Sequence, residues 1–165
     1  MLWREVKRDQ NPSFRTLAIA QAALAIGILI YIPLRSENLH ELMFDKHIFL
    51  RDGKRATSTL EVGSEEVKNG ETGLAFDIPS HIARMLTEYR QDIAPSVIGR
   101  RPDYVFVRAD GCRKGQAMLA ILIKRYLRKR AGIMITPHQF RHLAAKIILR
   151  TNPGAYETVP PVARA

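Results

Sequence analysis

The strongest constraint on the fold is a long apolar segment near the N-terminus. This segment, Leu17–Leu34, is interrupted only by Gln21, Gly27 and Pro33. A helix of this composition has no polar face to turn toward water, so it must be covered on all sides. It is therefore either the central helix of a globular core or, at the lower limit of length, a membrane span.

The residues that flank the apolar segment bear on this choice. Ser13 is a suitable N-cap and Pro33 breaks helices, so we predict a helix from Phe14 to about Tyr31. The positive charges within residues 1–12 would suit a signal anchor. The remaining chain is highly basic, however, and this favours a globular domain with a buried helix. A membrane-anchored basic protein is the less favoured alternative.

The remaining hydrophobic patterns predict an α+β domain that is mainly helical and carries a small antiparallel β-sheet. Turn signals of the hairpin type separate the expected strands. We predict strands at 47–50, 57–62 and 74–78, helices at 36–42, 80–89 and 113–130, an extended segment at 105–107, a loop at 90–104, and a linker or frayed leading segment at 1–12.

Charge and cysteine content indicate the class of partner and the compartment. The chain has 165 residues, 46% of them hydrophobic, which is enough for one folded domain. Its formal net charge is +10, with basic residues spread along the chain, and this favours nucleic acid over a membrane surface. Cys112 is the single cysteine, which excludes an internal disulfide framework and fits a reducing cytoplasm. No Cys/His spacing indicates zinc, and we expect no metal and no cofactor.

The motif most informative about chemistry is Thr136–His142. Thr136 is a plausible N-cap and Pro137 fits the first helical turn, so His138 and Arg141 fall on one helix face. That face would present an imidazole and a guanidinium beside a helix N-terminus, which already favours anions. A lone His-x-x-Arg on an amphipathic helix is usually only surface, so the motif needs support from elsewhere in the chain.

That support comes from a second segment, Pro33–Leu39. The two segments together resemble the catalytic domain of the tyrosine recombinases, also called phage integrases. That family carries an Arg after a hydrophobic helix, a Lys in a β-hairpin, a His-x-x-Arg on a later helix, a further His or Trp, and a Tyr nucleophile. The resemblance runs from about Leu17 to Val159. It implies the integrase catalytic-domain fold at 13–159, metal-free phosphoryl transfer in DNA integration and recombination, and a cytoplasmic, nucleoid-associated protein.

The resemblance assigns roles to four residues. Arg35 and Arg141 occupy the two family positions for arginines that stabilise the charge on the non-bridging phosphate oxygens, a task that suits planar forked donors. His138 matches the acid–base histidine, and Lys68 matches the hairpin lysine that protonates the leaving 5′ oxygen. Without the resemblance, Lys68 would be interpreted as an ordinary exposed hairpin lysine.

Two departures from the family pattern matter. The family commonly has an acidic residue three places after the first Arg, to orient it; here that place holds Asn38, with Glu37 one residue earlier. We expect Asn38 and Glu37 to support Arg35, less firmly than an acid in that place. The second departure concerns the nucleophile, because Tyr156 lies too close to Arg141 and in the wrong segment to serve. We therefore expect the chain as printed to bind and polarise a phosphate without cleaving a strand.

The helix expected at 113–130 has a basic face, which is most often merely solvated. The family resemblance makes contact with double-stranded DNA the preferred interpretation here. We expect four of its residues to contact DNA, and we leave open that the chain also forms a homo-oligomer. The four residues are Arg113, Lys114, Lys124 and Arg128.

The last residues, 160–165, depart from the family pattern and are expected to be an aberrant tail. One nucleotide inserted into codons for the family string Val-Arg-Arg-Leu-Leu-Gly-His-Lys would produce this tail and a stop. The favoured function is a DNA-binding recombinase catalytic domain incomplete at its C-terminal end. The main alternative is a non-catalytic DNA-binding remnant or regulator.

Overall fold

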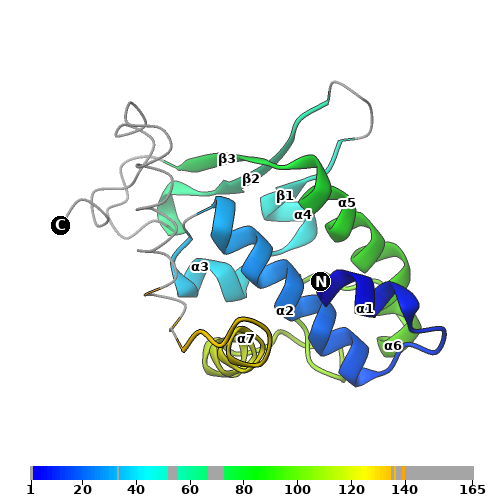
Figure 1. The fold of residues 1–165 in the computed structure, drawn as a ribbon. Coiled ribbons are helices and arrows are strands. Elements are labelled where there is room, and N and C mark those ends of the chain that lie inside the picture. The colour runs from blue at the N-terminus through cyan, green and yellow to red at the C-terminus, as the bar shows by residue number, and fades with distance from the viewer. Residues whose placement is uncertain are drawn as a thin grey trace.

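Helices dominate the structure, and three short strands form one small sheet (Figure 1). This computed structural model describes residues 2–32, 34–51, 56–66, 73–134, 136 and 139. The fold class predicted from the sequence, mainly helical α+β with a small antiparallel sheet, is confirmed. In chain order the elements are α1 (Leu2–Arg8), α2 (Phe14–Tyr31), α3 (Ser36–Glu41), α4 (Phe44–His47), β1 (Ile48–Phe49), β2 (Ser58–Val62), the 3₁₀ turn η1 (Ser64–Glu66), β3 (Leu74–Ile78), α5 (Ser80–Glu88), the π-helical turn η2 (Tyr89–Ile93), α6 (Ala94–Ile98) and α7 (Gln116–Ala131).

The apolar segment near the N-terminus forms α2, with the bounds predicted for it. Figure 1 shows α2 crossing the middle of the molecule, where it packs against α1, α5, α6 and α7. Among the residues that the structure describes, α2 is the one helix long and apolar enough to span a membrane, with a mean hydropathy of 1.7. Of that segment 61% is buried, however, so packing inside the domain accounts for its composition.

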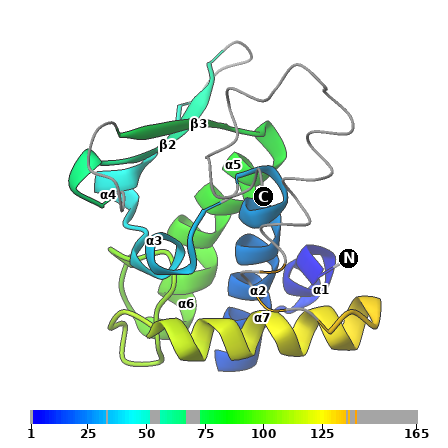
Figure 2. The same cartoon turned by 90° about the vertical axis from the view of Figure 1, so that its left-hand side faces the viewer.

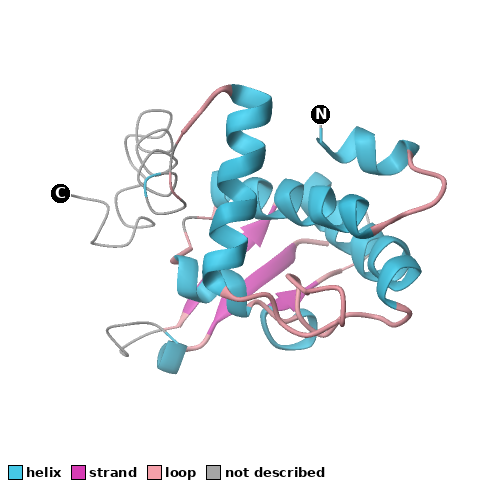
Figure 3. Ribbon diagram, turned by 90° about the horizontal axis from the view of Figure 1, so that it is seen from below, coloured by secondary structure: helices cyan, strands magenta, loops and turns pink. Residues whose placement is uncertain are grey.

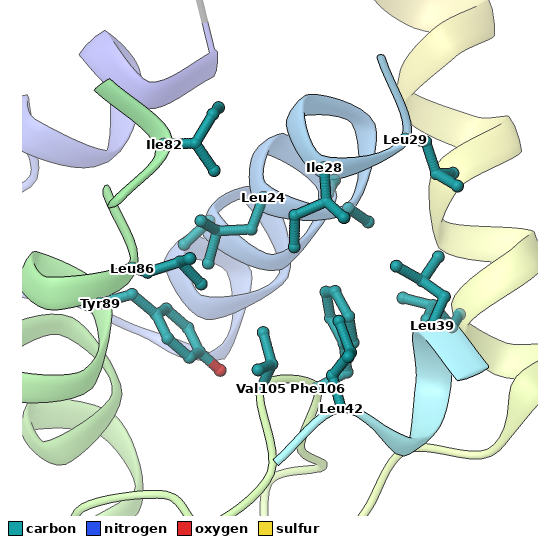
Figure 4. Close-up of a cluster of buried hydrophobic side chains, with 14 of the residues drawn as sticks. Leu24, Ile28, Leu29, Leu39, Leu42, Ile82, Leu86, Tyr89, Val105 and Phe106 are labelled. Atoms are coloured by element: carbon teal, nitrogen blue, oxygen red, sulfur yellow. The ribbon is translucent and has the colours of Figure 1, made fainter. Parts of the chain in front are cut away.

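The core forms where α2 meets α5, η2 and the segment around Phe106 (Figure 4). Leu24 and Ile28 of α2 face Leu86 and Tyr89, with Phe106 across from them, and all five are almost completely buried. Burying a side chain of this size stabilises a fold by about 1.5–3 kcal/mol. The helices are therefore held to α2 by a continuous apolar contact.

The sheet has the order β1–β2–β3, with both neighbouring pairs antiparallel. Leu60 of β2 pairs with Ile48 of β1 and with Phe76 of β3. Leu60 and Val62 are buried while Glu61 between them is exposed, as expected for a strand with one face on the core. Seen from below, helices lie in front of the strands and cover that face (Figure 3). Figure 2 shows the sheet near one end of α2 and α7 crossing near the other.

Residues 2–8 differ from the frayed leading segment predicted for them, because they form α1 and pack on α2. Val6 of α1 is buried in the core. Trp3 Nε1 donates to Glu88 Oε2 (3.0 Å), and Lys7 Nζ pairs with Glu88 Oε1 (2.9 Å). The prediction failed because the segment is polar in composition and its helix is stabilised by contacts with α2 and Glu88, which the sequence does not reveal.

The loop predicted at 90–104 is wrong for its first half, because a helix continues from α5 through η2 and α6 to Ile98. Pro95 prompted the error, since proline lacks the N–H that the helix needs and its ring clashes with the preceding turn. The π-helical turn just before it widens the helix, a usual adjustment where the regular hydrogen-bond ladder is broken. Gly99, with φ of 77°, then ends the run in the left-handed region.

The helix predicted at 113–130 is present but begins later, at Gln116. Arg113 and Lys114 are instead in extended backbone: Arg113 bridges Val107, and Lys114 N–H donates to Phe106 O (2.8 Å). Gly132, with φ of 67°, ends α7 in the left-handed region.

Candidate functional site

Arg35 stands immediately before α3, at the N-cap position, with extended backbone (φ −67°, ψ 150°). Its carbonyl accepts the first helical hydrogen bond, from Leu39 N–H (2.9 Å). The side chain is half-buried, and no hydrogen bond or ion pair engages it within the described part of the chain. A half-buried guanidinium in this situation is a good candidate for contact with an external anion.

Two polar contacts hold α3 against the start of α7. Gln116 Nε2 donates to Ser36 Oγ (2.7 Å), and Arg113 Nη1 pairs with Glu41 Oε1 (2.8 Å). The Arg113 guanidinium also lies over the Tyr104 ring, 5.8 Å from its centroid. Arg113, predicted to contact DNA, thus already has two partners inside the molecule, and a phosphate would have to compete with them.

A third contact ties α3 to the turn after β2. Asn38 Nδ2 donates to the backbone carbonyl of Glu66 (3.4 Å). Asn38 and Glu37 were predicted to support Arg35, but in the described part of the chain neither forms a hydrogen bond or ion pair with its side chain, and Glu37 is exposed. The support that the structure shows is indirect, because Asn38 fixes the helix that Arg35 begins.

Glu66 is a residue that the sequence reasoning missed. Its carboxylate accepts from Lys46 Nζ, from His47 Nε2 (3.1 Å to each oxygen) and from Gly63 N–H (3.1 Å). Met43 N–H donates to His47 Nδ1 (3.0 Å), so Nε2 carries the ring proton that faces Glu66. Partial burial alone would raise the pKa of the Glu66 carboxyl, but the donors outweigh it and hold that pKa below its usual value.

Three of the four predicted catalytic residues, Lys68, His138 and Arg141, lie outside the described residues, so their roles stay predictions. The structure does describe the cap of the helix predicted to carry the latter two. Thr136 Oγ1 accepts from Gln139 N–H (3.2 Å), and Gln139 Oε1 accepts from Thr136 N–H (2.8 Å). This reciprocal pair has the pattern of a capping box, which agrees with the N-cap predicted at Thr136.

Lys114 was predicted to contact DNA, but the structure places it inside the domain, 9% exposed. Its Nζ donates to Gln21 Oε1, and Gln21 Nε2 donates to both Tyr89 Oη (2.9 Å) and Val107 O (2.9 Å). Burial lowers the pKa of the Lys114 ammonium to about 8. This placement removes Lys114 from any surface open to DNA, because the side chain serves as a donor within the core.

Several exposed basic side chains lie along α7. Lys124 and Arg128 are exposed, and within the described residues no ion pair engages either. Together with Arg125, Lys129 and the exposed Ile121 they line a groove beside the helix. The two predicted DNA contacts on this helix therefore lie where a polyanion can reach them.

Comparison with known proteins gives a fold and no family. No family model matches the sequence, and no curated protein matches it. Solved structures with a similar fold include two recombinases. The site-specific recombinase XerH, bound to palindromic difH substrate in a post-cleavage complex, matches with a TM-score of 0.66 and 19% identity over 92% of this chain and 40% of that one. The recombinase XerA matches with a TM-score of 0.55 and 21% identity, over 82% of this chain and 48% of that one.

At these identities the comparison shows that the fold is the one found in those recombinases. This chain spans less than half the length of either neighbour.

Proposed function

We propose that this chain is a catalytic domain of the tyrosine recombinase type, and that it binds duplex DNA with one phosphodiester against Arg35. The observation that carries the proposal is the half-buried Arg35, placed directly after the central apolar helix in a fold shared with XerH and XerA. The XerH structure contains its DNA substrate, which supports DNA as the partner here. A DNA-acting role also supports the cytoplasmic, nucleoid-associated location expected from the sequence.

The chemistry proposed for the site is stabilisation of negative charge on a phosphodiester. Attack at phosphorus raises the charge on the non-bridging oxygens, and the guanidinium of Arg35 offers a planar pair of N–H donors to them. Lys68, His138 and Arg141 are proposed to complete the site on the strength of the family resemblance. Lys124 and Arg128 are proposed to contact neighbouring phosphates, which position a duplex without reading its sequence.

A binding titration with a short fluorescein-labelled duplex tests the proposal. Anisotropy should show weak binding that falls steeply with salt, because most of the affinity would come from released counterions. Arg35→Ala should weaken binding by about tenfold, the order of one charge-assisted contact, and should lower the salt slope by about one. Lys124→Ala and Arg128→Ala should each lower that slope by a similar amount.

The matched control is Arg15→Ala, which removes the same charge from an exposed position at the other end of α2. Its effect should be small, since α2 is roughly 27 Å long at 1.5 Å per residue and Arg15 lies far from Arg35. Equal losses of affinity in Arg15→Ala and Arg35→Ala would show that binding depends only on the total positive charge, and the assignment of Arg35 to a phosphate site would be wrong. No duplex binding even at low salt would count against DNA as the partner.

A second candidate function is DNA binding without strand cleavage, and the position of Tyr156 favours it. In the family pattern the nucleophile follows the second arginine at a greater distance than Tyr156 follows Arg141. A duplex with a nick traps a covalent protein–DNA adduct when a tyrosine attacks beside the nick, and a pool of nicked duplexes of varied sequence needs no known target site. We expect no adduct through Tyr156, because it follows Arg141 too closely for the family pattern. An adduct that is lost in Tyr156→Phe would show that this tyrosine does serve.

A further inference from the structure

Glu66 lies at a junction of three segments that are separate in the sequence. Its carboxylate accepts from Lys46 and His47 at the end of α4 and from the Gly63 N–H at the end of β2. Its backbone carbonyl accepts from Asn38 of α3. One residue therefore fastens α4, the turn after β2 and the helix that Arg35 begins.

Two of the three donors around Glu66, His47 and Gly63, are themselves fixed in place. His47 is buried, 4% exposed, and its second ring nitrogen accepts Met43 N–H, which sets the tautomer. The Gly63 donor belongs to the backbone. These two donors restrict the orientation of the Glu66 carboxylate, and with it the place at which the Glu66 carbonyl meets Asn38.

We propose that Glu66 is a positioning residue for Arg35 and acts through the hydrogen bond from Asn38 to its backbone carbonyl. This inference rests on the proposed function, because it concerns how tightly the phosphate-binding arginine is held. Arg35 has extended backbone and is the first residue outside α3. A shift of α3 relative to the turn after β2 would carry the guanidinium with it, and phosphate binding depends on placing that fork well.

The structure also distinguishes this indirect positioning of Arg35 from a direct orientation of Arg35 by Asn38. If Asn38 oriented Arg35 directly, it would use its acceptor oxygen, and aspartate would replace it well. In the structure Asn38 acts as a donor to a carbonyl, which aspartate cannot do. Asn38→Asp therefore distinguishes the two arrangements, because it keeps the size and the acceptor and removes the donor.

The test is a set of double-mutant cycles on the full chain, with affinity for the labelled duplex as the measurement. Asn38→Ala, Asn38→Asp and Glu66→Gln should each weaken binding by about threefold to tenfold in the parent chain, the range of coupling between contacting groups. In the Arg35→Ala background the same changes should have little further effect, because the arginine that they position is gone. Loss of a merely structural contact would weaken both backgrounds equally.

Glu65→Gln is the control, because it removes the same charge one residue earlier from an exposed side chain of η1. It should leave the affinity within about twofold and the coupling to Arg35 near zero. Circular dichroism and melting of each variant verify that it is folded. Should Glu66→Gln fail to fold, Asn38→Ala and Asn38→Asp carry the same test from the other end of the hydrogen bond.

The outcomes separate the two proposals. If Arg35→Ala binds DNA as the parent does, the proposed function fails and the inference fails with it. If Arg35→Ala weakens binding while the Asn38 and Glu66 changes are additive with it, the function stands and the positioning role is wrong. Full retention of Arg35-dependent affinity in Asn38→Asp would overturn the route through the Glu66 carbonyl.

Discussion

Two polar clusters of this domain use similar hydrogen bonds in opposite surroundings. The inner cluster lies in the core, where Gln21 joins Tyr89, Lys114 and the carbonyl of Val107. The outer cluster lies at the edge of the sheet, where Glu66 gathers its three donors. Water can replace a lost partner in the outer cluster but not in the inner one. The inner cluster should therefore control stability, and the outer one the placement of Arg35.

The burial of the two clusters explains this division. Gln21 has no measurable exposure and Lys114 is 9% exposed, whereas the Glu66 side chain retains 21% of its surface. A polar group left unpaired in a dry core costs about 1–3 kcal/mol, and less where solvent can reach it. The same chemical change should thus cost more in the inner cluster, and the predictions below test that comparison.

The largest effect is expected from Gln21→Ala. This change leaves the Tyr89 hydroxyl, the Val107 carbonyl and the Lys114 amine without their partner and opens a cavity between α2, η2 and the segment around Val107. We expect the free energy of unfolding in urea to fall by about 3 kcal/mol. Gln21→Met keeps most of the volume and should recover only the part due to the cavity. A loss below about 1 kcal/mol would show that the cluster is not needed for stability.

The inner cluster also predicts a pH dependence on the alkaline side of neutral. Burial lowers the pKa of Lys114 from 10.5 to about 8, so the folded chain binds its proton less tightly than the unfolded chain. Below pH 8 both states hold the proton and the folded state bears the full cost of a buried charge. Between pH 8 and 10.5 the folded state releases it first, so stability should rise, by at most about 3 kcal/mol.

Lys114→Met is the matched variant for this measurement, since it keeps a long apolar chain and removes the titrating group. Urea unfolding of both proteins across this range cancels the contribution of the other lysines and tyrosines. The difference between the two curves should change in favour of the parent as pH rises. A flat difference would mean that Lys114 titrates alike in the folded and unfolded chain.

The central helix and the residue that follows it show how much of the structure could be predicted from the sequence. The bounds of α2 were predictable because Ser13 and Pro33 mark its ends locally and the segment between them is continuously apolar. The placement of Arg35 directly after that helix and before α3 followed from the same signals. Features that depend on residues close together in the sequence could therefore be predicted from the sequence alone.

The missed features depend on residues distant in the sequence. Lys114 looks like part of a basic helix face, and only its contact with Gln21, 93 positions earlier, shows that it is buried. Glu66 looks like one of two solvated acids, and its importance comes from Lys46 and His47 on another element. A single sequence carries no local pattern for such pairs, because tertiary packing creates them.

Glu66→Gln should have a smaller effect on stability than Gln21→Ala has in the inner cluster. An amide has one acceptor oxygen in place of two, so at least one of the donors from Lys46, His47 and Gly63 loses its partner to water. We expect a loss of about 1 kcal/mol at neutral pH, and none measurable for the exposed neighbour in Glu65→Gln. A loss as large as that of Gln21→Ala would erase the distinction between the two clusters.

The smallest effect is expected in acid, and it isolates the charge of Glu66 from its shape. The pKa of this carboxyl is held below its usual value of 4.5, so the unfolded chain binds the proton more tightly than the folded chain. The resulting stability is fully present above pH 4.5 and is lost as pH falls through the folded pKa.

A protonated carboxyl has the same shape as an amide and one acceptor fewer than a carboxylate. The stabilities of the parent chain and Glu66→Gln should therefore converge in urea unfolding as pH falls below 4.5, while the difference between parent and Glu65→Gln stays near zero throughout. Curves that remain parallel into acid would show that the carboxylate charge contributes nothing, and that geometry alone holds Glu66 in place.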